Sequence, residues 1–328
     1  MNKAKKIFVT LPFDFKEARE LLCNSGFEVV INEELPLERD VFLRESKGCH
    51  GIICYPNQKI DKEFLDFVGD QLKVICTNSV GYDHIDLREC EKRNIKIGYC
   101  PNVVNVAVAE FTIGLLINVA RRISEGIEFY KRNEMNSYWK ESFLLGKNLE
   151  GAVIGILGLG RIGMSIATRL RGFEVKQIIY HNRNRRTEAD NLGYEYVSFD
   201  DLLMRSDFII CSCSLNKDSE QIFNRKAFEK MKSSAIFINV ARGDCIDQDD
   251  LFNALKTNRI LAADLDVTSP QPLPPNHKLF TLENCFITPY LSSAEEKSRG
   301  RMSLITAKNL INGLKDQDLL YPLNYREQ

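Results

Sequence analysis

The feature that most constrains this chain is the alternation of short apolar runs with charged, helix-prone segments along almost its whole length. Runs that are apolar throughout and separated by helices are typical of strands in a parallel sheet covered on both faces. The sequence therefore predicts an α/β fold built from parallel sheets. In the first third of the chain the candidate strands are residues 6–11, 28–31, 51–55, 72–77 and 95–99.

The rhythm stops after residue 99 and starts again at Gly151, so the 328 residues favour two domains. Residues 105–132 are predicted to form one long helix, bent near 124–126. Residues 294–313 are predicted to form a helix that packs back on the first domain. The second series of candidate strands covers residues 152–158, 177–180, 194–197, 207–212, 235–241, 260–267 and 285–290.

Composition excludes several classes of partner. The net charge of -1 provides no field that would recruit nucleic acid or an anionic membrane. The N-terminus lacks a signal or transit pattern, and no run of about 18 apolar residues suggests a membrane span. Ten cysteines are scattered from Cys23 to Cys285, without a C-x-x-C pair or metal-type spacing. We therefore expect a reduced, cytosolic protein with no metal site.

A glycine pattern after the first strand of the second series predicts a dinucleotide site. The segment GILGLGRIG contains G-x-G-x-x-G as Gly158, Gly160 and Gly163. Gly158 permits a sharp turn, Gly160 lets the backbone approach a pyrophosphate, and Gly163 allows the helix to pack near the strand. Arg161 and Ile162 begin that helix, and the backbone N–H groups at its N-terminus attract anions. A plain tight turn is the alternative, but the strand and helix on either side favour the nucleotide.

The segment after the next strand indicates which nucleotide binds. An NAD site usually has an acid there, which binds the ribose 2′-OH. Residues 181–186 contain no carboxylate, and Arg183, Arg185 and Arg186 cluster instead. A guanidinium suits a 2′-phosphate because its planar fork donates two parallel hydrogen bonds. NADP(H) is therefore the preferred coenzyme, with NAD(H) possible; a solvated basic loop is the alternative.

Several further segments resemble the D-isomer-specific 2-hydroxy-acid dehydrogenases, and most nearly the glyoxylate/hydroxypyruvate reductases. The resemblance implies a flavodoxin-like substrate domain (1–104 plus 291–328) and an NAD(P)-binding Rossmann domain (105–290), with the active cleft between them. It also implies a homodimer, and hydride transfer between a nicotinamide and a small 2-oxo or 2-hydroxy acid. The matching segments are SVGYDHIDL (79–87), PNVVNVAVAE (101–110), GILGLGRIG, INVARGDCIDQDDL (238–251) and AADLDVTSPQPLP (262–274).

The resemblance implies residue roles on the substrate side. Val80 and Gly81 match the loop whose backbone N–H groups hold the substrate carboxylate, as an anion nest does; an ordinary turn is the alternative. Arg242 matches the arginine that binds the substrate carboxylate and carbonyl oxygen, where negative charge grows as hydride arrives. An ion pair with Asp244 is the alternative for Arg242.

Two further residues match family positions. Asp266 matches the acid that hydrogen-bonds the nicotinamide amide, with a helix or loop cap as the alternative. Ser293 matches a hydroxyl on the substrate side, with a helix N-cap as the alternative.

Two family positions differ in this chain. Tyr290 replaces the general-acid histidine after Thr-Pro, and Gln271 replaces the carboxylate that orients this histidine and raises its pKa. The chain has four histidines, and motif position makes each one structural or peripheral. They are His50, His84, His181 and His277.

These substitutions leave two hypotheses for function. A phenol has an ordinary pKa near 10, so at neutral pH it holds a proton that it could donate to a developing alkoxide. One hypothesis is an NADPH-dependent reductase of glyoxylate or hydroxypyruvate in which Tyr290 is the acid and activity is reduced. The other is a catalytically silent NADP(H)-binding protein that acts as a sensor or interaction module.

Overall fold

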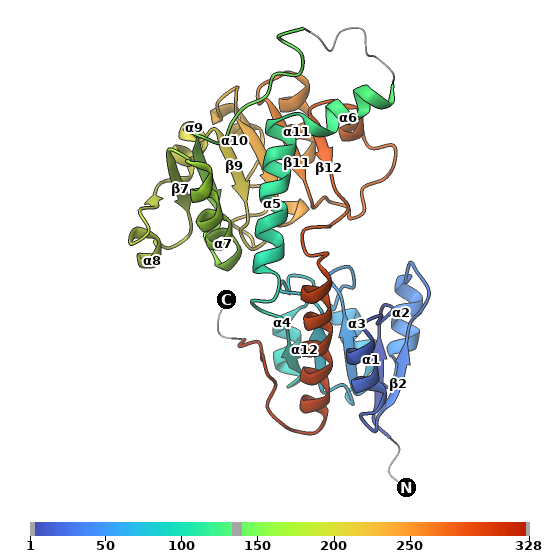
Figure 1. Ribbon diagram of the computed structural model, residues 1–328. Helices are drawn as coiled ribbons and strands as arrows, with labels where there is room; N and C mark the ends of the chain where they lie inside the picture. The colour runs from blue at the N-terminus through green and yellow to red at the C-terminus, as the bar shows by residue number, and fades with distance from the viewer. Residues whose placement is uncertain (1–3, 133–139, 326–328) are drawn as a thin grey trace. The chain divides into compact units, whose positions relative to one another are not determined.

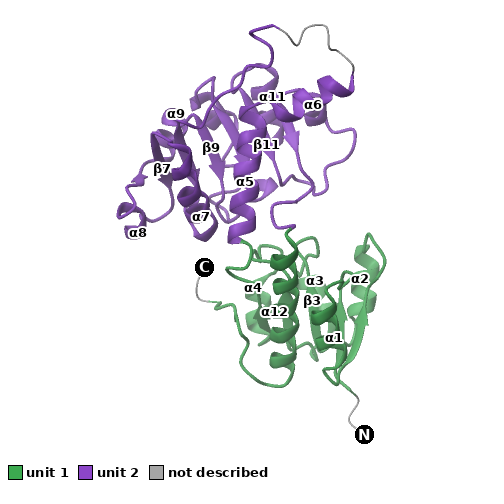
Figure 2. Ribbon diagram, viewed as in Figure 1, with its two compact units in different colours: residues 1–104, 295–328 green, residues 105–294 purple. Residues whose placement is uncertain are grey.

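The computed structural model describes residues 4–132 and 140–325. It divides the chain into two compact units: residues 1–104 and 295–328 form unit 1, and residues 105–294 form unit 2 (Figure 2). Along the chain, this division falls at 294/295; the domain boundary expected from the sequence, at 290/291, stays a prediction.

Unit 1 contains a five-stranded sheet in the order β2-β1-β3-β4-β5, with all its pairings parallel. This order is the flavodoxin-like one, in which the chain reverses direction across the sheet between β1 and β3. The strands are β1 (Lys6–Val9), β2 (Glu28–Ile31), β3 (Gly51–Cys54), β4 (Val74–Thr77) and β5 (Lys96–Gly98). The helices are α1 (Lys16–Cys23), α2 (Arg39–Ser46), α3 (Lys62–Val68), α4 (Leu87–Lys92) and α12 (Glu296–Leu314).

The last helix, α12, packs against α1 and the middle strands of this sheet, as predicted from the sequence (Figure 1). Small residues make the close approach possible. A Cβ on Gly51 would lie 2.9 Å from Leu314 Cδ1, and a Cβ on Gly98 would lie 3.0 Å from Asn309 Cβ. The C-terminal segment therefore completes the core of the N-terminal domain.

Unit 2 contains a seven-stranded parallel sheet in the order β12-β11-β10-β9-β6-β7-β8. The first three strands of the unit lie side by side in the spatial order β8-β7-β6. The chain then crosses to the other side of β6 to form β9, which is the Rossmann order. The predicted fold class, two Rossmann-like α/β domains, is confirmed. The strands are β6 (Val153–Leu157), β7 (Gln177–His181), β8 (Glu195–Tyr196), β9 (Phe208–Cys211), β10 (Ile236–Asn239), β11 (Ala262–Leu265) and β12 (Cys285–Ile287).

Helices cover this sheet in two groups: α5 packs along α7, and α9, α10 and α11 pack in succession (Figure 1). The α-helices are α5 (Asn105–Ala120), α6 (Ile123–Lys131), α7 (Arg161–Leu170), α8 (Thr187–Asp190), α9 (Phe199–Arg205), α10 (Arg225–Lys230) and α11 (Gln248–Lys256). The 3-10 turns are η2 (Arg171–Phe173), η3 (Gly243–Cys245) and η4 (Lys278–Thr281). None of the helices in the described residues is long and apolar enough to cross a membrane.

The predicted long helix over 105–132 is two helices, with the break before the expected bend. Arg122 adopts a left-handed conformation (φ 54°) and ends the continuity of α5 with α6. Asn118 stabilises the break, because its side-chain oxygen accepts from the Ser124 backbone N–H (3.0 Å) and hydroxyl (2.8 Å). The sequence does not show this, because the partner atoms meet only after the chain has turned.

Asn118 also donates through Nδ2 to Oδ2 of Asp264 (3.3 Å), a fully buried acid in β11. Burial, with the nearby charge of Asp266, raises the pKa of Asp264 from 3.8 to about 7. The other carboxylate oxygen of Asp264, Oδ1, is buried without a hydrogen-bond partner. The ionised form is therefore disfavoured in the folded protein.

This burial predicts a pH-dependent stability. As the pH rises from 3.8 to about 7, the unfolded chain releases the Asp264 proton before the folded chain does, so the free energy of unfolding falls. A pKa difference of one between the folded and unfolded states corresponds to about 1.4 kcal/mol in the free energy of unfolding. We expect Asp264→Asn to stabilise the protein by a few kcal/mol at pH 8 and by much less at pH 4, measured by urea unfolding.

The matched control is Asp70→Asn, an exposed acid whose side chain forms no ion pair with another described residue. It should change stability little at either pH. An Asp264→Asn variant whose advantage does not grow with pH would contradict the assignment of a raised pKa.

Candidate active site

The glycine turn between β6 and α7 has the geometry that the motif predicts. Gly158 has φ 93°, which L side chains rarely adopt, and a Cβ there would lie 2.4 Å from the backbone of Cys213. A Cβ on Gly163 would lie 2.3 Å from the Gly158 carbonyl oxygen. At Gly160, which precedes the first helical residue, a Cβ would meet no atom within 4 Å. Space is thus left where an anion would approach the helix end.

The loop after β7 is tied to this turn. Asn182, one residue beyond β7, accepts from the Leu159 backbone N–H through Oδ1 (2.6 Å). Arg186 donates from Nη1 to the Leu159 carbonyl (3.1 Å), and its backbone N–H donates to Tyr180 Oη (2.9 Å). An amide therefore stands where NAD sites usually have a carboxylate, and a guanidinium lies against the glycine turn.

The other two arginines of the cluster lie further out. Arg183 is exposed and makes no hydrogen bond or ion pair with another described residue. Arg185 is also exposed, and its Nε pairs with both oxygens of Asp190 (3.2 and 3.0 Å). The structure brings Arg186 to the turn, keeps Arg185 partly neutralised, and leaves the charge of Arg183 available.

A second group of residues follows the carboxyl ends of three neighbouring strands. Asn239 on β10 pairs with Leu265 on β11, which pairs with Ile287 on β12. These three paired residues form one row across the sheet. Arg242 lies three residues after Asn239, and Tyr290 lies three residues after Ile287. Strands two apart in a sheet are separated by about 10 Å, a distance that two long side chains can close. The fold therefore places Arg242 and Tyr290 on the same edge of unit 2, the edge where α/β sheets bind ligands.

The loop that carries Arg242 packs closely on the loop after β11. A Cβ on Gly243 would lie 2.0 Å from the Thr268 carbonyl carbon and 2.5 Å from the Ser269 nitrogen. Asn239 stabilises the same turn, since its Nδ2 donates to the Arg242 carbonyl (2.8 Å). Glycine at 243 is thus required for contact between the two loops, and Arg242 is positioned by that contact.

Asp266 organises the segment around Tyr290. Its buried carboxylate accepts on Oδ1 from the Thr288 hydroxyl (2.7 Å) and the Leu291 N–H (2.7 Å), and on Oδ2 from the Ser292 N–H (2.9 Å). Its carbonyl accepts from the Tyr290 N–H (3.1 Å). These are the contacts of a loop cap, the alternative reading of Asp266; contact with a nicotinamide amide stays a prediction.

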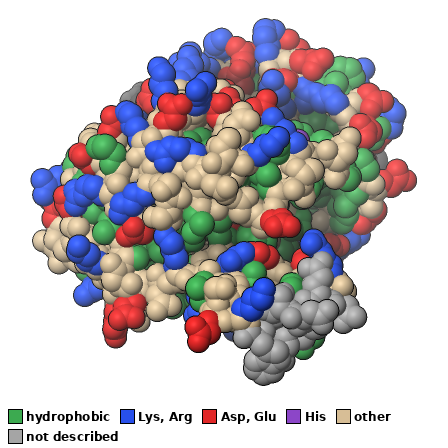
Figure 3. Space-filling view, turned by 90° about the horizontal axis from the view of Figure 1, so that it is seen from above, with side chains coloured by type: hydrophobic (Ala, Val, Ile, Leu, Met, Phe, Trp, Pro, Cys, Tyr) green, Lys and Arg blue, Asp and Glu red, His purple; other side chains and the backbone are tan. Residues whose placement is uncertain are grey.

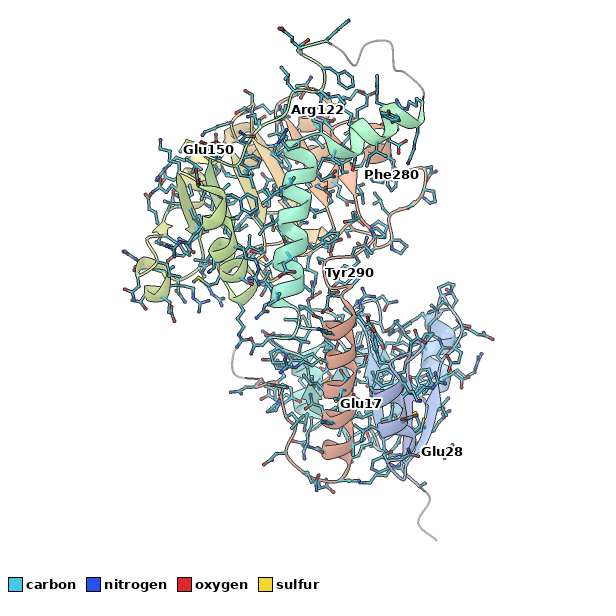
Figure 4. All side chains as sticks on the ribbon, in the orientation of Figure 1. Glu17, Glu28, Arg122, Glu150, Phe280 and Tyr290 are labelled. Carbon is cyan, nitrogen blue, oxygen red and sulfur yellow. The ribbon has the colours of Figure 1, made fainter. Side chains whose placement is uncertain are left out.

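Tyr290, labelled in Figure 4, is half-buried and has φ 58°. A left-handed conformation is uncommon for a residue other than glycine, and persists only where the surroundings impose it. Asp266 supplies that constraint, because its carboxylate accepts hydrogen bonds from Thr288 and Leu291 on the two sides of Tyr290. The main-chain conformation of Tyr290 is therefore held by a buried carboxylate that follows the neighbouring strand β11.

Gln271 lies on the exposed part of the loop after β11. Its side-chain oxygen accepts from the Thr268 backbone N–H (2.7 Å) and hydroxyl (3.1 Å). The amide therefore closes its own turn, a role that needs only an acceptor oxygen.

The predicted carboxylate loop belongs to unit 1 and follows β4. Ser79 bonds the Gly81 carbonyl through its hydroxyl (2.5 Å), which fixes the turn that contains Val80. Ser293 is half-buried at the end of unit 2. The alternative reading of Ser293 as a helix N-cap is wrong, because Glu295 caps α12 through the N–H groups of Lys297 and Ser298.

All four histidines make hydrogen bonds within their own unit, in support of the structural roles expected from the sequence. Their imidazole nitrogens meet Lys6 N (His50, 3.1 Å), Thr77 Oγ1 (His84, 3.1 Å), Val197 O (His181, 2.9 Å) and Leu279 N (His277, 3.3 Å).

A cavity of about 600 Å³ in unit 2 lies away from this edge. Its lining includes Arg122, which precedes α6, and Leu261 and Asn284, which precede the amino ends of β11 and β12. Figure 4 shows Arg122 and Tyr290 at opposite ends of unit 2. Since ligands of α/β sheets bind at the carboxyl ends of strands, this cavity is not the candidate active site.

Figure 3 shows charged side chains of both signs interspersed over the face it displays.

Sequence reasoning missed three residues that organise the site: Asn182, Gly243 and Thr288. Asn182 could have been found, because it stands where the acid of an NAD site is usually sought. Gly243 and Thr288 act through contacts with other loops, and the sequence carried no signal for either.

Comparison with known proteins agrees with the geometry. Residues 113–292 match the family model described as "D-isomer specific 2-hydroxyacid dehydrogenase, NAD binding domain". The human glyoxylate reductase/hydroxypyruvate reductase is 43% identical over 317 residues, which are 96% of this chain and 96% of that protein. The glyoxylate reductase of Thermofilum pendens is 40% identical over 88% of this chain and 86% of its own.

Solved structures are similar over nearly the full length. A Thermus thermophilus protein has a TM-score of 0.90 at 34% identity, covering 97% of this chain and 100% of its own. An NADPH-dependent glyoxylate/hydroxypyruvate reductase from Sinorhizobium meliloti, solved with NADP and malonate, has a TM-score of 0.85 at 26% identity, with 98% of each chain covered.

The glycine turn makes a testable distinction. Gly163→Ala forces a Cβ against the Gly158 carbonyl, so we expect it to lower the free energy of unfolding by about 1–3 kcal/mol. Gly160→Ala meets open space, so its stability should fall by about 1 kcal/mol at most, the order of a lost N-cap. Gly160→Ala should nevertheless weaken NADPH binding at least about tenfold, or 1.4 kcal/mol. Urea unfolding and calorimetric titration measure the two effects, and full NADPH affinity in Gly160→Ala would argue against phosphate binding at this turn.

Proposed function

Because the chain belongs to the D-isomer-specific 2-hydroxyacid dehydrogenases, which are oxidoreductases acting on CH–OH donors, we propose that it reduces a small 2-oxo acid of the glyoxylate/hydroxypyruvate class with NADPH. The observation that carries this proposal is the placement of Arg242 and Tyr290 on the carboxyl edge of unit 2, beyond the register row of β10 to β12. The relatives named for this activity cover nearly the whole chain.

The residues around the glycine turn fit a nicotinamide dinucleotide. Gly160 leaves room for a pyrophosphate, and the N-terminus of α7 presents unpaired N–H groups to it. When bound, the coenzyme supplies the hydride that carbonyl reduction needs. The preference for NADPH rests on Asn182 in place of an acid, and on Arg183 and Arg186, which offer guanidinium groups to a 2′-phosphate.

Arg242 is proposed to bind the substrate. Its planar guanidinium can hold a carboxylate and also stabilise the carbonyl oxygen as negative charge develops there. Such a charge-stabilising donor is typically worth 10²–10³-fold in rate. Val80 and Gly81 are proposed to donate backbone N–H groups to the substrate carboxylate.

Tyr290 is proposed to donate the proton to the developing alkoxide. Its main chain is held by Asp266, so the phenol starts from a defined direction. Gln271 is neutral and engaged with Thr268, so no carboxylate at this position competes with the phenol for a proton. Reduction needs a donor only, which a phenol can be; alcohol oxidation needs a base and is expected to be slow.

The second candidate is a catalytically silent NADP(H)-binding protein. It is favoured by one observation: both positions that differ from the family pattern, Tyr290 and Gln271, belong to the acid pair, while the glycine turn is intact. Coenzyme oxidation by the purified protein, with glyoxylate and hydroxypyruvate as substrates, separates the two. A homodimer stays a prediction for either candidate.

The role of Tyr290 predicts the effect of Tyr290→Phe. Removal of the hydroxyl should lower kcat by about 10²–10⁴-fold, because a positioned general acid contributes that much. NADPH affinity, measured by calorimetry, should stay unchanged. The double variant Tyr290→His with Gln271→Glu should restore an imidazole acid and its partner, and raise turnover above that of Tyr290→Phe. Unchanged turnover in Tyr290→Phe would remove the phenol from the reaction.

The arginine cluster predicts a selective loss of NADPH affinity. Arg183→Ala should weaken NADPH binding by about 10- to 100-fold, since a hydrogen bond to a charged group is worth about 1.5–3 kcal/mol. NADH binding should not change. Arg171→Ala, an exposed arginine at the far end of α7, is the matched control and should alter neither. Equal loss of both coenzymes in Arg183→Ala would show that this arginine does not recognise the 2′-phosphate.

A further inference from the structure

Three cysteines from two segments of unit 2 meet beside the glycine turn. Cys211 ends β9, Cys213 lies two residues further, and Cys245 lies in η3 after β10. All three sulfur atoms lie within 4.8 Å of one another, and the Sγ atoms of Cys211 and Cys213 are 3.8 Å apart. Each of the three is a free thiol.

This spacing is that of ligands around one ion. Zinc–sulfur bonds are about 2.3 Å long, so three sulfurs around one zinc ion lie about 4 Å from one another. The 3.8 Å separation of the Cys211 and Cys213 sulfurs agrees with this value. The distances from these sulfurs to that of Cys245 are at most 4.8 Å, so they would shorten by less than about 1 Å on metal binding. Sulfur is a soft ligand that selects Zn²⁺ and Cu⁺ over Mg²⁺ or Ca²⁺.

The surroundings also suit a thiolate site. Cys211 and Cys245 are fully buried, in the same hydrophobic cluster as Phe223 and Phe237, whereas Cys213 is half-buried and provides a route of entry. Cys245 lies three residues after Arg242, and its N–H donates to the Arg242 carbonyl (3.2 Å). Cys245 therefore lies in the same loop as the positively charged Arg242.

We propose that Cys211, Cys213 and Cys245 bind one Zn²⁺ ion through three thiolates, with water in the fourth position on the half-exposed side of Cys213. Binding releases the thiol protons to solvent and changes no oxidation state. The ion would join two functional segments. Cys213 packs on Gly158 of the coenzyme turn, and Cys245 follows the arginine assigned to the substrate.

The test uses the full-length protein, reduced with a phosphine and freed of metal by chelation. Zn²⁺ is added, the excess is removed by gel filtration, and bound metal is counted by elemental analysis. Cd²⁺ is added in parallel, because thiolate–cadmium bonds absorb in the ultraviolet. We expect about one ion of either metal per chain, with a cadmium band that saturates at about one equivalent.

Variants locate the ion without reference to enzyme activity. Cys245→Ala and Cys213→Ala should each lower the affinity for both metals at least about tenfold, since even the loss of a ligand's outer partner costs 10- to 100-fold. Cys285→Ala, a buried thiol on β12, and Cys23→Ala, an exposed thiol on α1, are matched controls and should retain the ion. If Cys245→Ala does not fold, by circular dichroism, Cys213→Ser at the half-exposed position decides the result.

Two results would overturn the site. One is a reduced wild-type protein that retains no Zn²⁺ or Cd²⁺ after gel filtration. The other is retention that Cys213 and Cys245 substitutions leave unchanged, which would place the metal elsewhere. Both readouts count metal, so neither depends on whether the protein reduces 2-oxo acids.

Discussion

In unit 2, every strand pairing is parallel, and the rest of the site depends on this constraint. Parallel strands deliver all their carboxyl ends to one edge of the sheet, so loops distant in the sequence share that edge. Between β6 and β9 the strand order reverses, and the glycine turn lies at this reversal. The glycine turn, Arg242 and Tyr290 are thereby brought to one edge by topology alone.

Close contact between loops then sets the details. Gly158, Gly163 and Gly243 each lie where a Cβ would come within 2.5 Å of another backbone atom. Loops packed this tightly transmit small displacements to one another, because no side chain lies between them to adjust. The three cysteines meet in the same region: Cys211 ends β9, Cys213 packs on Gly158 of the glycine turn, and Cys245 lies in the loop that carries Arg242.

The scaffold around Tyr290 does not depend on which residue occupies that position. Asp266 holds the segment through Thr288, Leu291 and Ser292, using main-chain N–H groups and one hydroxyl. A histidine or a tyrosine can therefore stand at position 290 without loss of the loop. Gln271 likewise closes its turn through an oxygen that a glutamate would also possess. Structure is thus retained while the acid changes, which is why turnover must be measured to distinguish the reductase from a silent binder.

The sequence by itself determined the parallel α/β class, the strand positions to within a few residues, the glycine turn, and the absence of a carboxylate after β7. These follow from local patterns, since apolar runs, glycine spacing and the residue after a strand are all read within one segment. Only the tertiary structure decided the break at Arg122, the loop-capping contacts of Asp266, the buried state of Asp264 and the meeting of Cys211, Cys213 and Cys245. Each of these depends on atoms from segments far apart in the chain, whose distances are set by packing and not by sequence spacing.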